Sequence, residues 1–184
     1  MRTFISIEIP EEIKDNIEKM INELKLMLTP IKWVDKKNMH ITLKFLGWVE
    51  DRKIDALTGS VADMTKGFGT IKIGFSGLGV FPDERHPRVV WVGLSEGEEK
   101  VKELADRIED ELAKQGYKSE EREFSAHLTI GRIKEKIDVA PLEKLIKDNE
   151  RKSFGSFVAS HVSLMKSTLM RTGPIYEEVK QLIL

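Results

Sequence analysis

The chain has 184 residues, 40% of them hydrophobic and 33% charged, with a formal net charge of −1. It is long enough to bury an ordinary core, and its near-zero charge argues against a protein that coats long nucleic acids through a bulk basic surface. Cysteine is absent, which excludes disulfides, thiolate catalysis and cysteine-based metal sites, and no run reaches the roughly 18 apolar residues of a membrane span. The first residues turn acidic before a signal-peptide core could form, so we expect a globular cytoplasmic protein.

Strand-like and helix-like patterns alternate along the first half of the chain. Alternation of apolar and polar residues predicts strands, and apolar residues spaced three and four apart predict helices. Pro10, followed by two glutamates, suits the first turn of a helix, while Gly67 and Gly69 suit the end of another. The predicted elements are a strand at 2–9, a helix at 11–28, a strand, turn and strand within 33–47, a helix at 51–65 and a strand at 70–81.

The second half of the chain continues this alternation after a polar turn at 82–86. Its predicted elements are a strand at 87–94, a helix at 98–114, a strand at 126–133, a helix that begins near Pro141, a strand at 156–167 and a last strand at 175–184. No stretch is of low complexity, and no linker rich in Pro, Gly or Ser separates independent domains. We therefore expect an α+β protein that forms a single domain over residues 1–184.

One short pattern occurs twice. The segments HITL at 40–43 and HLTI at 127–130 share the order His, apolar, Thr, apolar, and a glycine follows each within a few residues. Residues i and i+2 of a strand lie on one face, so each copy presents an imidazole and a hydroxyl together while its apolar residues anchor the other face. Two such strands brought together would surround a small group with two His and two Thr.

A single His-X-Thr on a strand carries little weight, because Thr favours strands and a half-buried His is common. The chain has only four His, however, and two of them stand in matching contexts, so coincidence is the weaker explanation. Neither copy contains a carboxylate or a second His at ligand spacing, which argues against zinc, and no GxSxG elbow supports a serine hydrolase. Two imidazoles instead suit general acid–base catalysis near neutral pH, one neutral to accept a proton and one charged to donate it.

The segments HITLKFLG (40–47) and HLTIGR (127–132) resemble the two signatures of the two-histidine (2H) phosphoesterase superfamily, in particular its RNA 2′,3′-cyclic phosphodiesterase or 2′-5′ RNA ligase branch. The resemblance extends over 2–10, 75–94 and 162–179, and so covers nearly the whole chain. It implies a bilobal α+β fold in which two antiparallel β-sheets, related by a pseudo-twofold axis, surround a central cleft with the helices outside. The chain would then be one 2H phosphoesterase domain made of two interleaved lobes.

The resemblance implies metal-independent hydrolysis of RNA 2′,3′-cyclic phosphate ends to 2′-phosphomonoesters, with no cofactor. By analogy with the family, His40 is the general acid and His127 the general base. Thr42 and Thr129 should donate hydrogen bonds to nonbridging phosphate oxygens. Arg132 follows the second Thr by three positions, and its guanidinium fork could contact two phosphate oxygens at once.

Several other residues are weaker candidates. Phe45 resembles the family's aromatic residue that stacks on the terminal base, although a place in the core is an alternative. His161 and Ser163 imitate the motif without its Thr and Gly, and we interpret this His as a surface residue of the last sheet. His86 lies in a polar turn and is expected to be solvated. A local basic rim for the RNA backbone could come from Lys44, Lys134, Lys166 and Arg171, although a solvated surface charge is the commoner role for any one of them.

Two other functions remain open from the sequence. One is an RNA-binding module that keeps the fold without the chemistry. The other is a ligase that joins a cyclic-phosphate end to a 5′-hydroxyl end through a 2′-5′ bond, which is the same chemistry in reverse. In either case we expect a monomer whose partners are RNA 3′ ends with 2′,3′-cyclic phosphate, tRNA fragments among them, and no membrane.

Overall fold

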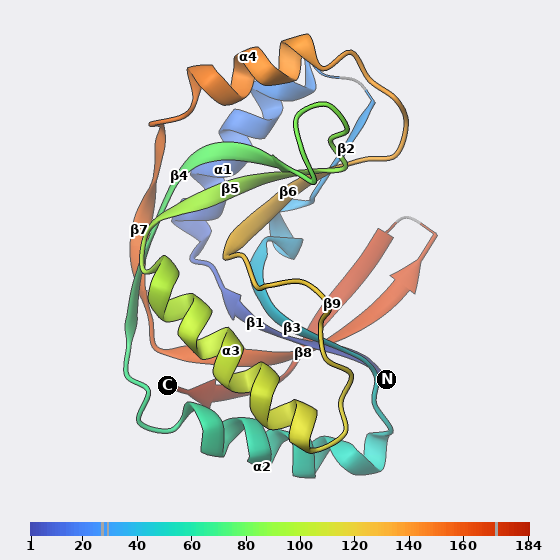
Figure 1. Ribbon diagram of the computed structural model, residues 1–184, viewed down its shortest axis with the longest axis vertical. Coiled ribbons are helices and arrows are strands. Elements are labelled where there is room, and N and C mark those ends of the chain that lie inside the picture. The colour runs from blue at the N-terminus through green and yellow to red at the C-terminus, as the bar shows by residue number, and fades with distance from the viewer. Residues whose placement is uncertain (27, 29, 172) are drawn as a thin grey trace.

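The computed structural model describes residues 1–26, 28, 30–171 and 173–184 (Figure 1). Strands and helices alternate along the chain, and short 3-10 turns occupy Lys36–Asn38 and Asp51–Lys53. The elements are β1 (Arg2–Glu8), α1 (Glu11–Lys25), β2 (Ile31–Trp33), β3 (His40–Trp48), α2 (Ile54–Thr65), β4 (Ile71–Phe81), β5 (Val89–Glu96), α3 (Glu98–Lys114), β6 (His127–Ile133), α4 (Ala140–Asp148), β7 (Ser153–Ala159), β8 (His161–Met170) and β9 (Gly173–Ile183).

The strands form two antiparallel sheets. The first has the order β3-β1-β8-β9, and the second has the order β2-β6-β5-β4-β7. The predicted α+β class with two antiparallel sheets is therefore confirmed. Both sheets draw strands from both ends of the chain, because β8 and β9 return to the first sheet after β7 has joined the second.

The two sheets share one arrangement. In the first, β1 lies between the motif strand β3 and β8; in the second, β5 lies between the motif strand β6 and β4. A helix follows each central strand and packs on the opposite sheet, since α1 contacts β7 whereas α3 contacts β3. Figure 1 shows α1 and α4 beside the second sheet, and α2 and α3 beside the first. This exchange of helices ties the two halves together.

The helices are amphipathic, and their apolar stripes build the core. In α1, Ile13, Ile17 and Ile21 are almost fully buried, while Glu11 in the first turn and Lys25 in the last suit the helix dipole. Apolar residues of both sheets belong to a single buried cluster with these helices. We propose on this basis that the chain is one domain of two interleaved lobes, which would unfold in a single cooperative transition in calorimetry.

The alternation of β1 separates two different faces. Ile5 and Ile7 are completely buried members of the hydrophobic cluster. Phe4, Ser6 and Glu8 point the other way, and the ring of Phe4 stacks on a motif imidazole. The face of the first sheet that carries polar groups is therefore distinct from the face that packs on helices.

One predicted strand was wrong. Residues 156–167 were expected to form a single strand, but β7 ends at Ala159 and β8 begins at His161, in a different sheet. Ser160 alone connects the two strands, so the crossing carries none of the Gly or Pro signals that mark longer loops. The helix expected at 11–28 ends at Lys25, and positions 27 and 29 lie outside the described residues.

Candidate active site

The two motif strands meet where the sheets approach each other. β3 and β6 are in direct contact although they belong to different sheets. On the first sheet His40 is paired with Glu8 of β1 and Thr42 with Ser6. On the second, β5 supplies the corresponding partners, Gly93 for His127 and Trp91 for Thr129. Tertiary structure thus brings together the two copies that the sequence separates.

Both motif strands carry a β-bulge immediately after the threonine. In β3 the pairing passes from Thr42 to Lys44 and skips Leu43, and in β6 it passes from Thr129 to Gly131 and skips Ile130. An extra residue reverses the alternation that follows, because it shifts the strand by one position. The third residue after each threonine, which strict alternation would turn away, therefore returns to the face of the imidazole.

Phe45 and Arg132 occupy these two equivalent positions. Phe45 is paired with Phe4, whose ring centroid is 6.1 Å away, and 54% of its surface is exposed. A core position for Phe45 is thereby excluded, and its ring is available for stacking. Arg132 is also exposed, and its positive charge acts on both motif imidazoles and on Tyr176. The guanidinium therefore lies near both histidines.

The bulge has the opposite consequence for Lys44. Strict alternation would have placed this lysine beside His40 and Thr42, where it was predicted to form part of a basic rim. It is instead fully buried on the helix side, where its Nζ lies 2.5 Å from the Glu109 Oε2 and donates to the Lys118 carbonyl oxygen at 3.0 Å. The prediction for Lys44 was wrong because its charge is used to join β3 to α3.

Backbone carbonyl groups orient both imidazoles. The Nδ1 of His127 lies 2.7 Å from the carbonyl oxygen of Ser125, which can only accept, so Nδ1 carries the proton and Nε2 presents a lone pair. His40 makes the equivalent backbone hydrogen bond to Asn38, also two residues earlier. Its Nε2 lies 3.0 Å from the hydroxyl oxygen of Thr42. The two imidazoles are therefore oriented in the same way in both copies.

Aromatic rings pack around each imidazole. His40 stacks on Phe4 at 4.8 Å between centroids and meets Tyr176 edge-on at 5.2 Å. His127 meets Phe81 edge-on at 5.0 Å and lies 6.4 Å from Trp91. These four residues give no signal in the sequence, because they come from other strands of the two sheets and share no local pattern with the motifs.

Gly79 is required by one of these rings. Trp91 crosses the backbone at this glycine so closely that a Cβ would come within 2.1 Å of a ring carbon. The indole Nε1 of Trp91 is buried and has no hydrogen-bond partner among the described residues. The absence of a side chain at Gly79 therefore leaves room for the ring of Trp91 beside His127.

Burial sets the protonation of the site. Desolvation lowers the pKa of His40 to about 4, and the charges of Lys14 and Arg132 act in the same direction. Desolvation also lowers the pKa of His127, with a further contribution from Arg132. Both imidazoles are therefore neutral at pH 7 when no anion is present. An anionic group placed between them would favour the charged form of either ring.

The remaining candidates lie apart from this arrangement. His86 is exposed in the loop after β4, with its Nδ1 3.6 Å from an Asp83 carboxylate oxygen. Lys166 pairs with Glu177 at 3.0 Å, and Lys134 and Arg171 are exposed. His161, at the start of β8, is half-buried.

The segment that starts with His161 packs inward because β8 lies between β1 and β9. Its Ser163 is fully buried and donates a hydrogen bond to the Glu178 Oε2 at 2.6 Å. The imitation of the motif at 161–163 therefore lies inside the sheet pairing and not at an accessible edge.

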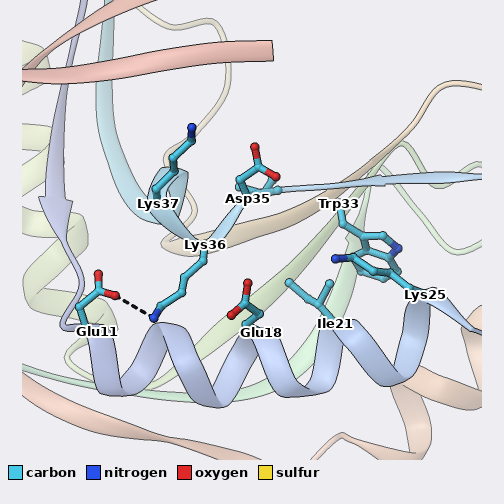
Figure 2. A pocket seen from close by; sticks show the side chains of 9 residues that line it. Glu11, Glu18, Ile21, Lys25, Trp33, Asp35, Lys36 and Lys37 are labelled. Atoms are coloured by element: carbon cyan, nitrogen blue, oxygen red, sulfur yellow. Dashed lines mark ion pairs between the residues drawn. The ribbon is translucent and has the colours of Figure 1, made fainter. Parts of the chain in front are cut away.

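A pocket of about 610 Å³ opens between α1 and residues 33–37 (Figure 2). Its charged wall is balanced, with three acidic and three basic side chains, and it includes neither histidine of the motifs. Lys36 already pairs with Glu11 at 2.8 Å and with Asp15 at 2.5 Å. This pocket offers no surplus positive charge for a phosphate, so we do not place the substrate there.

The part of the chain that the structure describes contains no group of three or more His, Asp or Glu side chains arranged to hold a metal ion. Within the same residues, no helix is both long and apolar enough to cross a membrane.

Comparison with known proteins matches both halves of the chain. The model of the LigT-like phosphoesterase family matches residues 7–91 and again 92–176, one motif in each match. The chain belongs to this family. The RNA 2′,3′-cyclic phosphodiesterase of Methanocaldococcus jannaschii is 38% identical to it over 181 residues, which are 98% of this chain and 99% of that one. The enzyme of the same name from Methanothermobacter thermautotrophicus is 34% identical over 98% of this chain and 97% of its own length.

Solved structures of similar length share the fold. The crystal structure of TT0787 from Thermus thermophilus superimposes with a TM-score of 0.83 at 20% identity, covering 100% of this chain and 98% of that one. Escherichia coli LigT, crystallised with 3′-AMP, gives a TM-score of 0.78 at 24% identity, with coverage of 100% and 97%. These likenesses establish that the whole chain has the LigT-like fold.

Proposed function

We propose that the protein hydrolyses 2′,3′-cyclic phosphate at RNA 3′ ends to a 2′-phosphomonoester. The names of its relatives support this activity, since both archaeal proteins are RNA 2′,3′-cyclic phosphodiesterases. The observation that carries the proposal is the pair of imidazoles, each fixed through a backbone carbonyl two residues earlier and each close to the charge of Arg132.

In the proposed reaction His127 is the general base. Its unprotonated Nε2 takes a proton from water while the water oxygen forms a new bond to phosphorus. The bond from phosphorus to the ribose O3′ breaks on the opposite side, and His40 gives this oxygen a proton so that no alkoxide leaves. Each cycle consumes one water. Afterwards His127 releases its proton to solvent and His40 regains one, which restores the starting state of the pair.

His40 must be protonated to act as the acid, although burial favours its neutral form. The negative charge of the bound cyclic phosphate supplies the missing stabilisation, because an opposite charge within a few ångströms favours the imidazolium. Binding of the substrate therefore favours the protonated form of His40 that the acid role requires. A ring that charges only beside the phosphate also avoids burying an unpaired cation in the unliganded protein.

The other residues of the two copies hold the phosphate and the base. Thr42 and Thr129 donate hydrogen bonds to the nonbridging oxygens, and the Arg132 guanidinium stabilises the negative charge that they carry in the transition state. Phe45 stacks on the terminal base through its exposed ring. No step needs a metal ion or a cofactor.

The expected substrates are cyclic-phosphate RNA ends, with tRNA fragments as one source, and we propose that the protein acts on them as a cytoplasmic monomer. The test is to incubate purified protein with a short RNA ending in 2′,3′-cyclic phosphate and to identify the phosphomonoester isomer. A 2′-phosphate is expected. A 3′-phosphate would show that O2′ leaves instead, and binding without any product would favour the catalytically silent module.

A second incubation separates hydrolysis from ligation. Adding an RNA with a 5′-hydroxyl tests whether a ribose hydroxyl can replace water as the nucleophile. A joined product with a 2′-5′ linkage would show that the protein also catalyses the reaction in the ligation direction.

A further inference from the structure

A second bulge in β3 extends the face that carries His40. After Phe45 the pairing skips Leu46 and continues with Gly47 and Trp48, the latter opposite Arg2 of β1. Directly paired residues of an antiparallel sheet share a face, so Trp48 lies on the same face as Arg2 and Phe4. Two successive bulges therefore place His40, Thr42, Phe45 and Trp48 in one row.

Trp48 is the most exposed aromatic side chain of this row. It is 84% exposed. Such exposure is unusual for Trp, whose large apolar ring is mostly buried in folded proteins. Its partner Arg2 is two residues from the partner of Phe45, a step of about 6.8 Å along a strand. The row therefore leads from the imidazole to one exposed ring and then to a second.

A cation lies beside this second ring. Arg2 is exposed, and it lies close enough to Tyr176, the phenol that meets His40 edge-on, for its charge to oppose the rise that burial causes in the pKa of this phenol. Aromatic rings that alternate with positive charge are the features that proteins use to bind single-stranded RNA by stacking and phosphate contact. The continuity of Trp48 and Arg2 with the proposed catalytic residues identifies RNA as the occupant.

We propose that the nucleotide immediately 5′ of the cyclic-phosphate nucleotide stacks on Trp48, with the phosphate that joins the two nucleotides beside Arg2. This inference rests on the proposed function and deepens it. The site then spans two nucleotides, and the enzyme prefers RNA ends to cyclic mononucleotides. Selection for RNA comes from stacking, which every base can provide, so the preference does not depend on sequence.

The test compares three substrates: adenosine 2′,3′-cyclic phosphate, an adenine dinucleotide with the same end, and that dinucleotide with an abasic 5′ ribose. Trp48→Ala should leave kcat/KM unchanged on the mononucleotide and lower it about 5- to 150-fold on the dinucleotide, the range expected for one lost stack. On the abasic dinucleotide the variant and the original protein should be equal. Trp48→Phe should keep most of the preference, because it keeps a ring.

Val158→Ala is the matched control. Val158 is a 58% exposed apolar residue on β7, the edge strand of the second sheet furthest from β2. Its replacement should change none of the three rates. Equal losses on the mononucleotide and the dinucleotide in Trp48→Ala would mean that Trp48 supports the fold, and no loss on the dinucleotide would mean that no base stacks there. Either result overturns the inference.

Two further outcomes are distinguishable from these. If the original protein hydrolyses none of the substrates, the proposed function fails, and quenching of tryptophan fluorescence by the dinucleotide, compared with Trp48→Phe, still decides whether the ring binds RNA. If Trp48→Ala changes the sedimentation of the protein, Trp48 is a contact between copies of the chain, and the inference is wrong.

Discussion

In the first half of the chain the residue three positions after the motif threonine is Phe45, and in the second half it is Arg132. Both residues follow the same bulge and return to the same face as their imidazole. The backbone therefore has the same bulge in both halves, while the side chain at this position differs: an aromatic ring in the first half and a cation in the second. We infer that one half binds the base and the other binds the charge.

The strands opposite the motifs have diverged as well. In the first half Glu8 lies opposite His40, its Oε1 accepts a hydrogen bond from Ser6 at 2.9 Å, and burial raises the pKa of its carboxyl group. In the second half Gly93 lies opposite His127, so no carboxyl stands there. Two equivalent imidazoles thus meet different surroundings, which is the condition for giving them different catalytic roles.

Removal of either imidazole should have the largest effect. We expect His40→Ala and His127→Ala each to lower kcat by about 10² to 10⁴, the usual contribution of one positioned acid or base. The pH profile of kcat for the original protein should be bell-shaped, with limbs that belong to the coupled pair. Without His127 the requirement for a deprotonated group should vanish, and without His40 the requirement for a protonated one. An intact bell in either variant would contradict the two-histidine mechanism.

Arg132 should matter less and in a different way. Arg132→Ala should lower kcat by about 10² to 10³, the cost of one lost donor to a developing oxyanion, and the pH profile should keep both limbs. Lysine at this position should restore only part of the rate, because a point charge cannot reproduce the bidentate fork. Phe45→Ala is the comparison at the equivalent position, and it should raise KM more than it lowers kcat. Similar changes in both variants would refute the division between base and charge.

The burial of His40 should appear as a pH-dependent loss of stability. Its pKa is near 6.5 when unfolded and about 4 in the folded protein, so between these values the unfolded chain binds more protons. Stability should therefore be complete above pH 6.5 and should fall as the pH is lowered to 4, by on the order of 3 kcal/mol for this group. Urea denaturation of the original protein and of His40→Gln at several pH values checks this. The difference between their free energies of unfolding should change between pH 6.5 and pH 4. Parallel curves would show that His40 titrates normally.

Chelation should have the smallest effect of all. The mechanism assigns the charge stabilisation to Arg132 and the proton transfers to the two imidazoles, so exhaustive treatment with EDTA should leave kcat unchanged. The measurement is the rate on a cyclic-phosphate RNA before and after dialysis against the chelator. Loss of activity that zinc or manganese restores would contradict this expectation.

Sequence patterns predicted the secondary structure well where an element is long and amphipathic. The helix expected at 98–114 matches α3 (Glu98–Lys114), because its apolar spacing and the following Gly116 are local signals. The crossing at Ser160 was missed, because a strand that changes sheets keeps the same alternation on both sides of the crossing. Local periodicity reports that a residue is extended, but it does not report which strand will pair with it.

The sequence by itself determined the duplication and predicted the chemistry. Two copies of His-X-Thr in a chain with four His and no Cys indicated a paired acid–base site before any contact was known. Tertiary structure alone decided which neighbours join that site. Pairing with β1 and β5 creates the bulges that turn Phe45 and Arg132 toward the imidazoles and Lys44 toward α3. The register of a strand is fixed by partners distant in the sequence, and one skipped residue reverses every side chain that follows.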